Sequence, residues 1–392
     1  MPTRTLLPLL LALCMAACTT TVRTTVPADT ASVPGADAGV APDNSHWHLD
    51  MGARPPAEAD GYRPPVKLAV LLPLSGDLST AAVPVRDGLL AGYYAEQRRR
   101  PELRFYDTAA GAVGAYDRAV ADGADYIVGP LGRDEVDALF RRGTLPVPVL
   151  ALNRAATPPP PGNASFSLAP EDDGIAAAEF LLDRGARRVL VLADSDDGMQ
   201  RAAAAFRARL VEGGGEVAAQ LAVAADPGDM GGALSAATAA DGGVDGVFLA
   251  MRGRQAAGLA PQLTAAGLGS ARRVATSQLA SASGEVTAGH ALDGIAFPSD
   301  AWEVRRVPGL PSQDEAAALL PSARGAAQRL FAFGHDAWLL TAYLDRLAND
   351  ANASLPGATG ELRLDASGNV VRAPAWSTYD GSRARPLGNA GG

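Results

Sequence analysis

Apolar runs and helix-like repeats alternate along most of this chain. In the first such unit, an apolar run at 68–72 is followed by a polar turn at 73–77, and apolar residues then recur every three or four positions over 82–98. A continuous apolar run is typical of a parallel strand that is covered on both faces. The unit therefore predicts a strand, a turn and a helix, which is how an open α/β sheet begins.

The same alternation continues and predicts the α/β fold class. Strands that alternate with helices form parallel sheets with right-handed crossovers. The segment 361–371 differs, because it alternates and turns like a β-hairpin. Further strands are expected at 103–106, 126–128, 147–152, 188–192, 217–223, 246–251, 273–275 and 294–297, and further helices at 112–122, 134–141, 172–183, 198–212, 231–240, 254–266 and 323–348.

The length of the chain indicates two lobes. From residue 66 onward, the 392-residue sequence is longer than a single core usually serves. The proline-rich segment 157–162 interrupts the series after four strands, which places the lobe boundary near 160–170. We expect each lobe to be a mostly parallel sheet flanked by helices, with the first at 66–165 plus part of 290–350 and the second at 166–290 plus part of 350–388.

The amino end has the features of an export signal. Arg4 precedes an apolar run that is shorter than the roughly 20 residues needed to span a bilayer, so residues 1–17 are expected to be a signal peptide. The run ends in Met-Ala-Ala-Cys, which resembles a bacterial lipobox and predicts lipidation of Cys18. Thr19, rather than aspartate, follows and favours sorting to the outer membrane. The alternative is a plain secretory signal with a chance cysteine.

Residues 18–65 are expected to form a flexible tether. They are rich in Thr, Ala, Pro, Asp and Gly and contain no periodic apolar residues. Such a composition cannot bury a core.

The composition argues against nucleic-acid binding and against most catalytic mechanisms. The net charge is −9, which disfavours a nucleic-acid partner. Both cysteines lie in the signal region, and Lys67 is the only lysine. The chain also lacks a Gly-x-Ser-x-Gly elbow, a Ser-x-x-Lys pair and a Gly-x-x-x-x-Gly-Lys phosphate loop. We therefore expect no catalytic residues, no metal site and no cofactor.

Two acidic clusters and one histidine are candidate sites, and the sequence around each favours a structural role. The clusters at 171–173 and 194–197 precede predicted helices, where carboxylates cap free N–H groups. Ala193 stands where a calcium loop needs its first ligand. His335 lies beside Asp336 among aromatic residues, which is more typical of a core histidine than of a catalyst.

Several sequence blocks together are similar to one protein family. They are Leu-Pro-Leu-Ser-Gly at 72–76, Val-Arg-Asp-Gly-Leu at 85–89, Tyr-Asp-Thr at 106–108, Ile-Val-Gly-Pro-Leu-Gly-Arg-Asp-Glu-Val at 127–136, Val-Leu-Ala-Leu-Asn at 149–153 and Gly-Ala-Thr-Gly-Glu-Leu at 357–362. They resemble the LppC/LpoA lipoproteins, the activators of class A penicillin-binding proteins. The resemblance covers roughly 66–388, and 129–136 is its most specific part.

The resemblance has consequences for fold, location and partners. It implies a two-lobed type I periplasmic binding fold on an outer-membrane lipoprotein that faces the periplasm. Such a lipoprotein would stimulate a class A penicillin-binding protein that synthesises peptidoglycan, with peptidoglycan itself as a further contact. Family members with a full architecture carry a helical repeat domain before this one, whereas here only the short tether is expected.

A solute receptor of a transporter is the alternative function. The turn after the first strand also resembles the type I periplasmic binding proteins, which include receptors for branched-chain amino acids, and ligands of open α/β sheets bind at the carboxyl ends of the strands. Arg133 stands where a Ser/Thr-bearing loop would be expected in such a receptor; it could bind an anionic group or pair with Asp134 or Glu135. The candidate ligand-binding residues are Ser75, Gly76, Asp107, Gly129, Arg133, Asn153 and Asp194.

Overall fold

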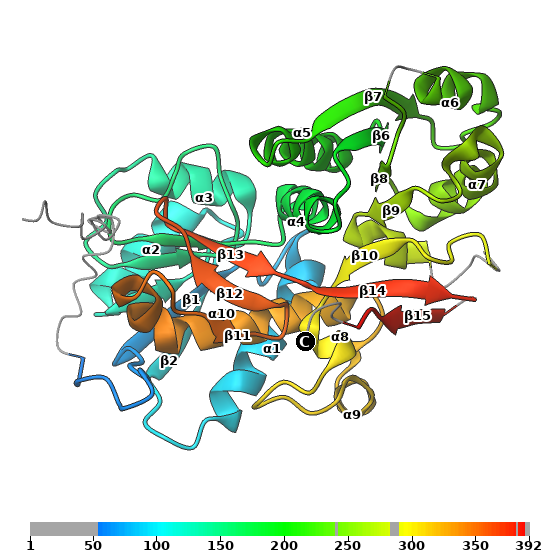
Figure 1. The fold of residues 1–392 in the computed structure, drawn as a ribbon. Helices are drawn as coiled ribbons and strands as arrows, with labels where there is room; N and C mark the ends of the chain where they lie inside the picture. The colour runs from blue at the N-terminus through cyan, green and yellow to red at the C-terminus, as the bar shows by residue number, and fades with distance from the viewer. Residues whose placement is uncertain (1–53, 240–241, 283–289, 382, 389–392) are drawn as a thin grey trace, which may run out of the picture. The chain divides into compact units, whose positions relative to one another are not determined.

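Two sheets with helices packed on them organise the chain (Figure 1). The computed structural model describes residues 54–239, 242–282, 290–381 and 383–388. Within these residues, one sheet has eight strands in the order β11-β12-β13-β5-β4-β3-β1-β2, and the other has seven in the order β15-β14-β10-β9-β8-β6-β7. Most neighbouring strands in the middle of each sheet are parallel, which confirms the predicted α/β class.

The first sheet has a covered core on each face. Leu68, Val70 and Leu72 pack against the inner side of α10, while Ala69 and Leu71 belong to a separate cluster with α2 and α3. The alternation of the two clusters along one strand is the period of two that a buried strand shows. The strands of the first sheet are β1 (Lys67–Leu72), β2 (Glu102–Asp107), β3 (Tyr126–Val128), β4 (Val149–Ala151), β5 (Ala164–Phe166), β11 (Leu355–Pro356), β12 (Glu361–Leu364) and β13 (Asn369–Ala373), and the helices packed on it are α1 (Ser79–Ala95), α2 (Ala112–Ala121), α3 (Arg133–Phe140) and α10 (Ala327–Asn349).

The second sheet is built in the same way. Phe206 of α5 stacks on Phe248 of β8 in the core of one face, with ring centroids 4.2 Å apart. Its strands are β6 (Arg188–Asp194), β7 (Glu216–Val223), β8 (Gly246–Ala250), β9 (Arg272–Ala275), β10 (Ala296–Ser299), β14 (Ala375–Asp380) and β15 (Arg383–Pro386), and its helices are α4 (Pro170–Asp183), α5 (Asp197–Glu212), α6 (Gly231–Thr238), α7 (Gly253–Leu263), η2 (Thr264–Leu268) and η3 (Ser277–Ala282).

The chain passes between the two sheets three times. It leaves the first sheet after β5, returns after β10 through α8 (Ala301–Val304), α9 (Gln313–Leu319) and η4 (Pro321–Ala323), and leaves again after β13. Only Pro374 separates β13 from β14, so one extended segment contributes a strand to each sheet (Figure 1). The predicted hairpin is present as β12 and β13, and it belongs to the first sheet.

Several features of the fold were not predicted, the strands β11, β14 and β15 among them. The strand β5 follows a proline-rich loop, and its sequence Ala-Ser-Phe lacks the continuous apolar run that marks the equally short β3. The helices between residues 301 and 323 were missed because their segment is short, rich in proline and weakly apolar. The packed region also begins before residue 66: Arg54 and Tyr62 are buried, and the Arg54 guanidinium lies 4.7 Å from the centre of the Tyr126 ring.

Two glycines allow the backbones of α1 and α10 to come into direct contact. A Cβ placed on Gly334 would lie 2.0 Å from the carbonyl oxygen of Val85, and one on Gly88 would lie 1.9 Å from that of Phe331. Any larger residue would have to push the helices apart. This contact fixes the position of α10 over the first sheet.

Gly334→Ala should therefore destabilise the fold. The added methyl group overpacks the helix contact, and we expect the free energy of unfolding to fall by about 1–3 kcal/mol. Gly232 in α6 is the matched control, because a Cβ there meets no atom within 4 Å. Gly232→Ala should leave the stability unchanged or raise it slightly, by up to about 1 kcal/mol. Urea denaturation measures both changes, and equal stabilities for the two variants would contradict the helix contact.

Candidate functional site

The structure places the predicted ligand-binding residues at the ends of strands in both sheets. All of them lie at or after the carboxyl end of a strand, which is the edge where ligands of such sheets bind. Ser75 and Gly76 follow β1, Asp107 ends β2, Gly129 and Arg133 follow β3, Asn153 follows β4, and Asp194 ends β6 of the second sheet.

Ser75 and Asp107 are brought together and bind each other. The Ser75 hydroxyl donates to Asp107 Oδ2 at 2.6 Å, and the backbone N–H groups of Leu74 and Ala109 donate to Oδ1 at 2.9 and 3.0 Å. These donors, the serine hydroxyl foremost, lower the pKa of the Asp107 carboxyl. Gly76 lies beside this pair with φ 76°, a conformation that glycine adopts without strain. The turn after β1 is thus held by the side chain that ends the neighbouring strand β2.

The loop after β3 is fastened in a similar way. A Cβ on Gly129 would lie 2.0 Å from the carbonyl oxygen of Leu71, so only glycine permits this approach to β1. The Asn153 amide donates to the carbonyl oxygen of Leu131 at 2.9 Å, and its Oδ1 accepts from the N–H of Arg154 at 2.9 Å. The predicted polar groups of this loop are therefore engaged in holding the backbone.

Arg133 and Asp194 have different surroundings. Arg133 is exposed at the first residue of α3 and forms no ion pair with Asp134 or Glu135; the Glu135 carboxylate instead accepts from the N–H of Gly132 at 3.0 Å. Asp194 accepts from the N–H of Asp196. The predicted capping role of the 194–197 cluster is confirmed, because Asp196 caps α5.

The capping role expected for Asp172 and Asp173 is wrong. Neither side chain caps α4, although both lie in its first turn. Asp173 Oδ2 accepts from the N–H and the hydroxyl of Ser277 at 2.9 and 2.5 Å, and Asp172 Oδ1 lies 3.1 Å from Arg154 Nη1. These carboxylates belong to a buried set of charges that sequence reasoning did not assemble.

That set, here called the charge cluster, consists of three arginines and three aspartates. Asp173 Oδ1 lies 3.8 Å from Arg329 Nη2 and 4.0 Å from Arg372 Nη2. Asp300 Oδ1 lies 3.8 Å from Arg329 Nε and 4.0 Å from Arg372 Nη1. The members are Arg154, Arg329, Arg372, Asp172, Asp173 and Asp300.

Burial dominates the electrostatics of the charge cluster. Asp172, Asp173, Asp300 and Arg372 are each at most 6% exposed. Desolvation raises the pKa of Asp172 and of Asp300, and the neighbouring guanidinium groups oppose that rise. A carboxylate that has lost its water needs such partners in order to stay ionised.

Asp336 contacts the charge cluster indirectly, through the backbone of residues 358–359. Its fully buried carboxylate accepts from the N–H of Ala358 at 2.6 Å and from the N–H and hydroxyl of Thr359 at 2.7 and 2.6 Å. The carbonyl oxygen of Thr359 in turn accepts from Arg372 Nη1 at 3.1 Å. The predicted structural role of the His335–Asp336 pair is consistent with this arrangement.

One signal in the sequence could have revealed the charge cluster. Val370 packs in the apolar core of the first sheet, and Arg372 stands two residues further along the same strand. Alternate residues of a strand face the same side, so an arginine occupies an inward position and needs a buried partner.

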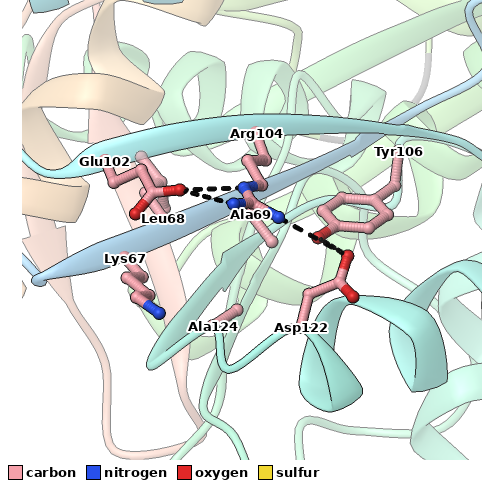
Figure 2. Close-up of a pocket in the computed structure, with 8 residues that line it drawn as sticks. All are labelled: Lys67, Leu68, Ala69, Glu102, Arg104, Tyr106, Asp122 and Ala124. Carbon is pink, nitrogen blue, oxygen red and sulfur yellow. Dashed lines mark hydrogen bonds and ion pairs between the residues drawn. The ribbon is translucent and has the colours of Figure 1, made fainter.

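A shallow depression lies elsewhere, where β1 and β2 begin (Figure 2). Its volume of about 10 Å³ suits a single water molecule. Arg104 pairs with Glu102 at 2.8 Å, and the Tyr106 hydroxyl donates to Asp122 at 2.8 Å, so four of the polar groups that line the depression bind one another. The lining residues are Lys67, Leu68, Ala69, Glu102, Arg104, Tyr106, Asp122 and Ala124.

Metal-ligating clusters and membrane-spanning helices are absent from the described ranges. No group of three or more His, Cys, Asp or Glu side chains there could hold a metal ion. In the same part of the chain, no helix is both long and apolar enough to cross a bilayer.

The two sheets, their three connections and the strand-end loops define a two-lobed periplasmic binding fold. The sequence matches the family described as "LppC putative lipoprotein" over residues 62–381, so the chain belongs to that family. This confirms the resemblance found in the sequence blocks.

Similar proteins extend this assignment. The penicillin-binding protein activator LpoA of Mannheimia succiniciproducens is 30% identical over 334 residues, which cover 82% of this chain and 55% of the relative. The chain thus spans about half the length of this curated relative.

Solved structures share the fold. The C-domain of LpoA from Haemophilus influenzae, described as a regulator of PBP1A, has a TM-score of 0.71 at 22% identity and is covered to 99%, against 82% of this chain. A structure described as "a putative branched-chain amino acid ABC transporter" from Chromobacterium violaceum has a TM-score of 0.62 at 31% identity and is covered completely, against 80% of this chain.

Ser75→Ala should raise the pKa of the Asp107 carboxyl. The variant removes the hydroxyl donor that stabilises the charged form, so the pKa should move up towards the ordinary value of about 3.9. Ser79→Ala is the control, because that hydroxyl donates to the carbonyl oxygen of Gly76 in the same turn and does not touch Asp107. NMR titration of the aspartate carboxyl carbons measures the change, and an identical pKa in both variants would contradict the pairing.

Proposed function

We propose that this chain activates a class A penicillin-binding protein and so regulates peptidoglycan synthesis. The observation that carries the proposal is membership of the LppC family, with relatives named as penicillin-binding protein activators matching over most of this chain. The Haemophilus influenzae C-domain, described as a regulator of PBP1A, supports assigning the regulatory role to this bilobal region.

The geometry of the strand-end loops supports a regulator over a carrier of small solutes. The polar groups of Ser75, Asp107 and Asn153 are bound to partners in their own or the neighbouring strand-end loop. A receptor needs such groups for its ligand, since a small site depends on a few precisely placed polar contacts. The chain acts as a regulator rather than an enzyme in this proposal.

The proposed location is the periplasmic side of the outer membrane. Lipidation at Cys18 would anchor the chain, and the segment that follows would link the anchor to the packed region that starts near Arg54. Cys18 and the expected signal and tether lie largely outside the described residues. Peptidoglycan, which surrounds such a protein, is a further proposed contact.

The direct test is a reconstituted synthesis reaction. Purified chain should co-purify with a class A penicillin-binding protein of the same cell and increase its rate of cross-linking from lipid-linked substrate several-fold. The chain without the synthase is the control and should form no product. Unchanged cross-linking with every class A synthase of that cell would refute the proposal.

A solute receptor remains the second candidate, because the transporter structure from Chromobacterium violaceum is 31% identical over its full length. If the chain is a receptor, a ligand at a hundred times its Kd adds about 2.7 kcal/mol to the free energy of unfolding. We expect no such gain in a thermal-shift screen of amino acids and peptidoglycan fragments. A clear upward shift with one compound would favour the receptor.

A further inference from the structure

We propose that the chain closes its two lobes with its own charges, so that one fixed arrangement of the lobes persists without any ligand. The inference concerns the charge cluster and goes beyond the proposed function. It rests on which lobe contributes which charge, on the burial of those charges and on the connections that join the lobes.

The charges are sorted by sign between the lobes. Every arginine of the cluster comes from an element of the first lobe: Arg154 follows β4, Arg329 lies in α10, and Arg372 lies in β13. The aspartates come from the second lobe, since α4 packs on α5 and Asp300 follows β10. Each ion pair in the cluster therefore joins one lobe to the other.

Ser277 extends the connection. Arg329 Nη1 donates to the Ser277 hydroxyl, and that hydroxyl donates to Asp173. Ser277 begins η3, directly after β9 of the second sheet. The guanidinium of Arg329 is thereby linked to the Asp173 carboxylate on α4, and also to Ser277, whose N–H and hydroxyl bind that carboxylate.

Because most of these charges are buried, their distribution between the lobes affects the stability of each lobe arrangement. A buried ion left without its partner is strongly unfavourable, so the three buried aspartates and the buried Arg372 favour the arrangement in which they meet their partners. The two hydrogen bonds through the Ser277 hydroxyl add a directional link between Arg329 and Asp173. Burial and geometry together select one spacing of the lobes.

The strand crossing limits motion at the same place. Arg372 stands two residues before Pro374, the single residue between β13 and β14. One side of this segment is hydrogen-bonded into the first sheet and the other into the second. The cluster therefore clamps one of the connections about which the lobes would have to rotate.

In a receptor that closes on its solute, the ligand bridges the lobes and shifts the population towards the closed state. Here guanidinium and carboxylate groups of the chain itself form the bridge. A solute can change the populations of open and closed lobes only if both states exist and it binds them with different affinity. A chain that has a single arrangement of its lobes has no second state to populate. The domain would then meet a protein partner as a rigid body.

The lobe spacing can be measured directly in the full chain. Spin labels are placed at Ala138→Cys in α3 and Ala204→Cys in α5, both exposed positions on different lobes, with Cys14 and Cys18 replaced by serine. Double electron–electron resonance should give one narrow distance distribution that saturating amino acids do not change. Two populations, or a shift on adding any of the amino acids, would overturn the inference.

Variants test whether the charge cluster sets that spacing. Arg329→Gln with Arg372→Gln should broaden the distribution, because the carboxylates then lose their cations. Arg209→Gln is the matched control, since Arg209 pairs with Glu179 and Glu212 within the second lobe, and it should leave the distribution unchanged.

Circular dichroism confirms that each variant is folded, and Arg154→Gln, which removes the partner of Asp172, replaces the double variant if that one does not fold. A folded cluster variant with the original narrow distribution also overturns the inference. Because no synthase is present, these results are independent of the proposed activation.

Discussion

The backbone contact between α1 and α10 is the constraint on which the rest of the structure depends. Gly88 and Gly334 let the two helices touch, and this sets the height of α10 over the first sheet. The position of α10 in turn places two of its residues, which connect it to other parts of the structure. Arg329 reaches the aspartates of the second lobe, and Asp336 holds the turn whose carbonyl positions Arg372.

Much of the fold could be predicted from the sequence, because each βα unit carries its own local pattern. The strands at 68–72 and 126–128 have continuous apolar runs, and the hairpin at 361–371 alternates visibly. Local patterns fail where an element has no continuous apolar run, as in β5 (Ala-Ser-Phe), or where proline interrupts the segment, as between residues 301 and 323. Tertiary contacts rather than propensity stabilise those elements.

The full charge cluster could not be predicted for a different reason. Arg372 stands at an inward position of its strand, but its partners are far apart in the chain, and the aspartates of α4 have an ordinary local explanation. Acidic residues in the first turn of a helix interact well with the helix dipole, so Asp172 and Asp173 resemble caps whether or not they bind an arginine. The strand-end residues differ from the cluster: Ser75 and Asp107 were predicted as candidate ligand-binding residues, and in the structure they bind one another.

The single residue between β13 and β14 has a consequence for how the chain must fold. Strands from the last part of the sequence complete both sheets, although most of each sheet is encoded much earlier. Contacts between such distant segments form slowly, because a long loop must close first. A chain that is synthesised from its amino end therefore cannot finish either lobe until its last segment has emerged, and the two halves reach their final form together.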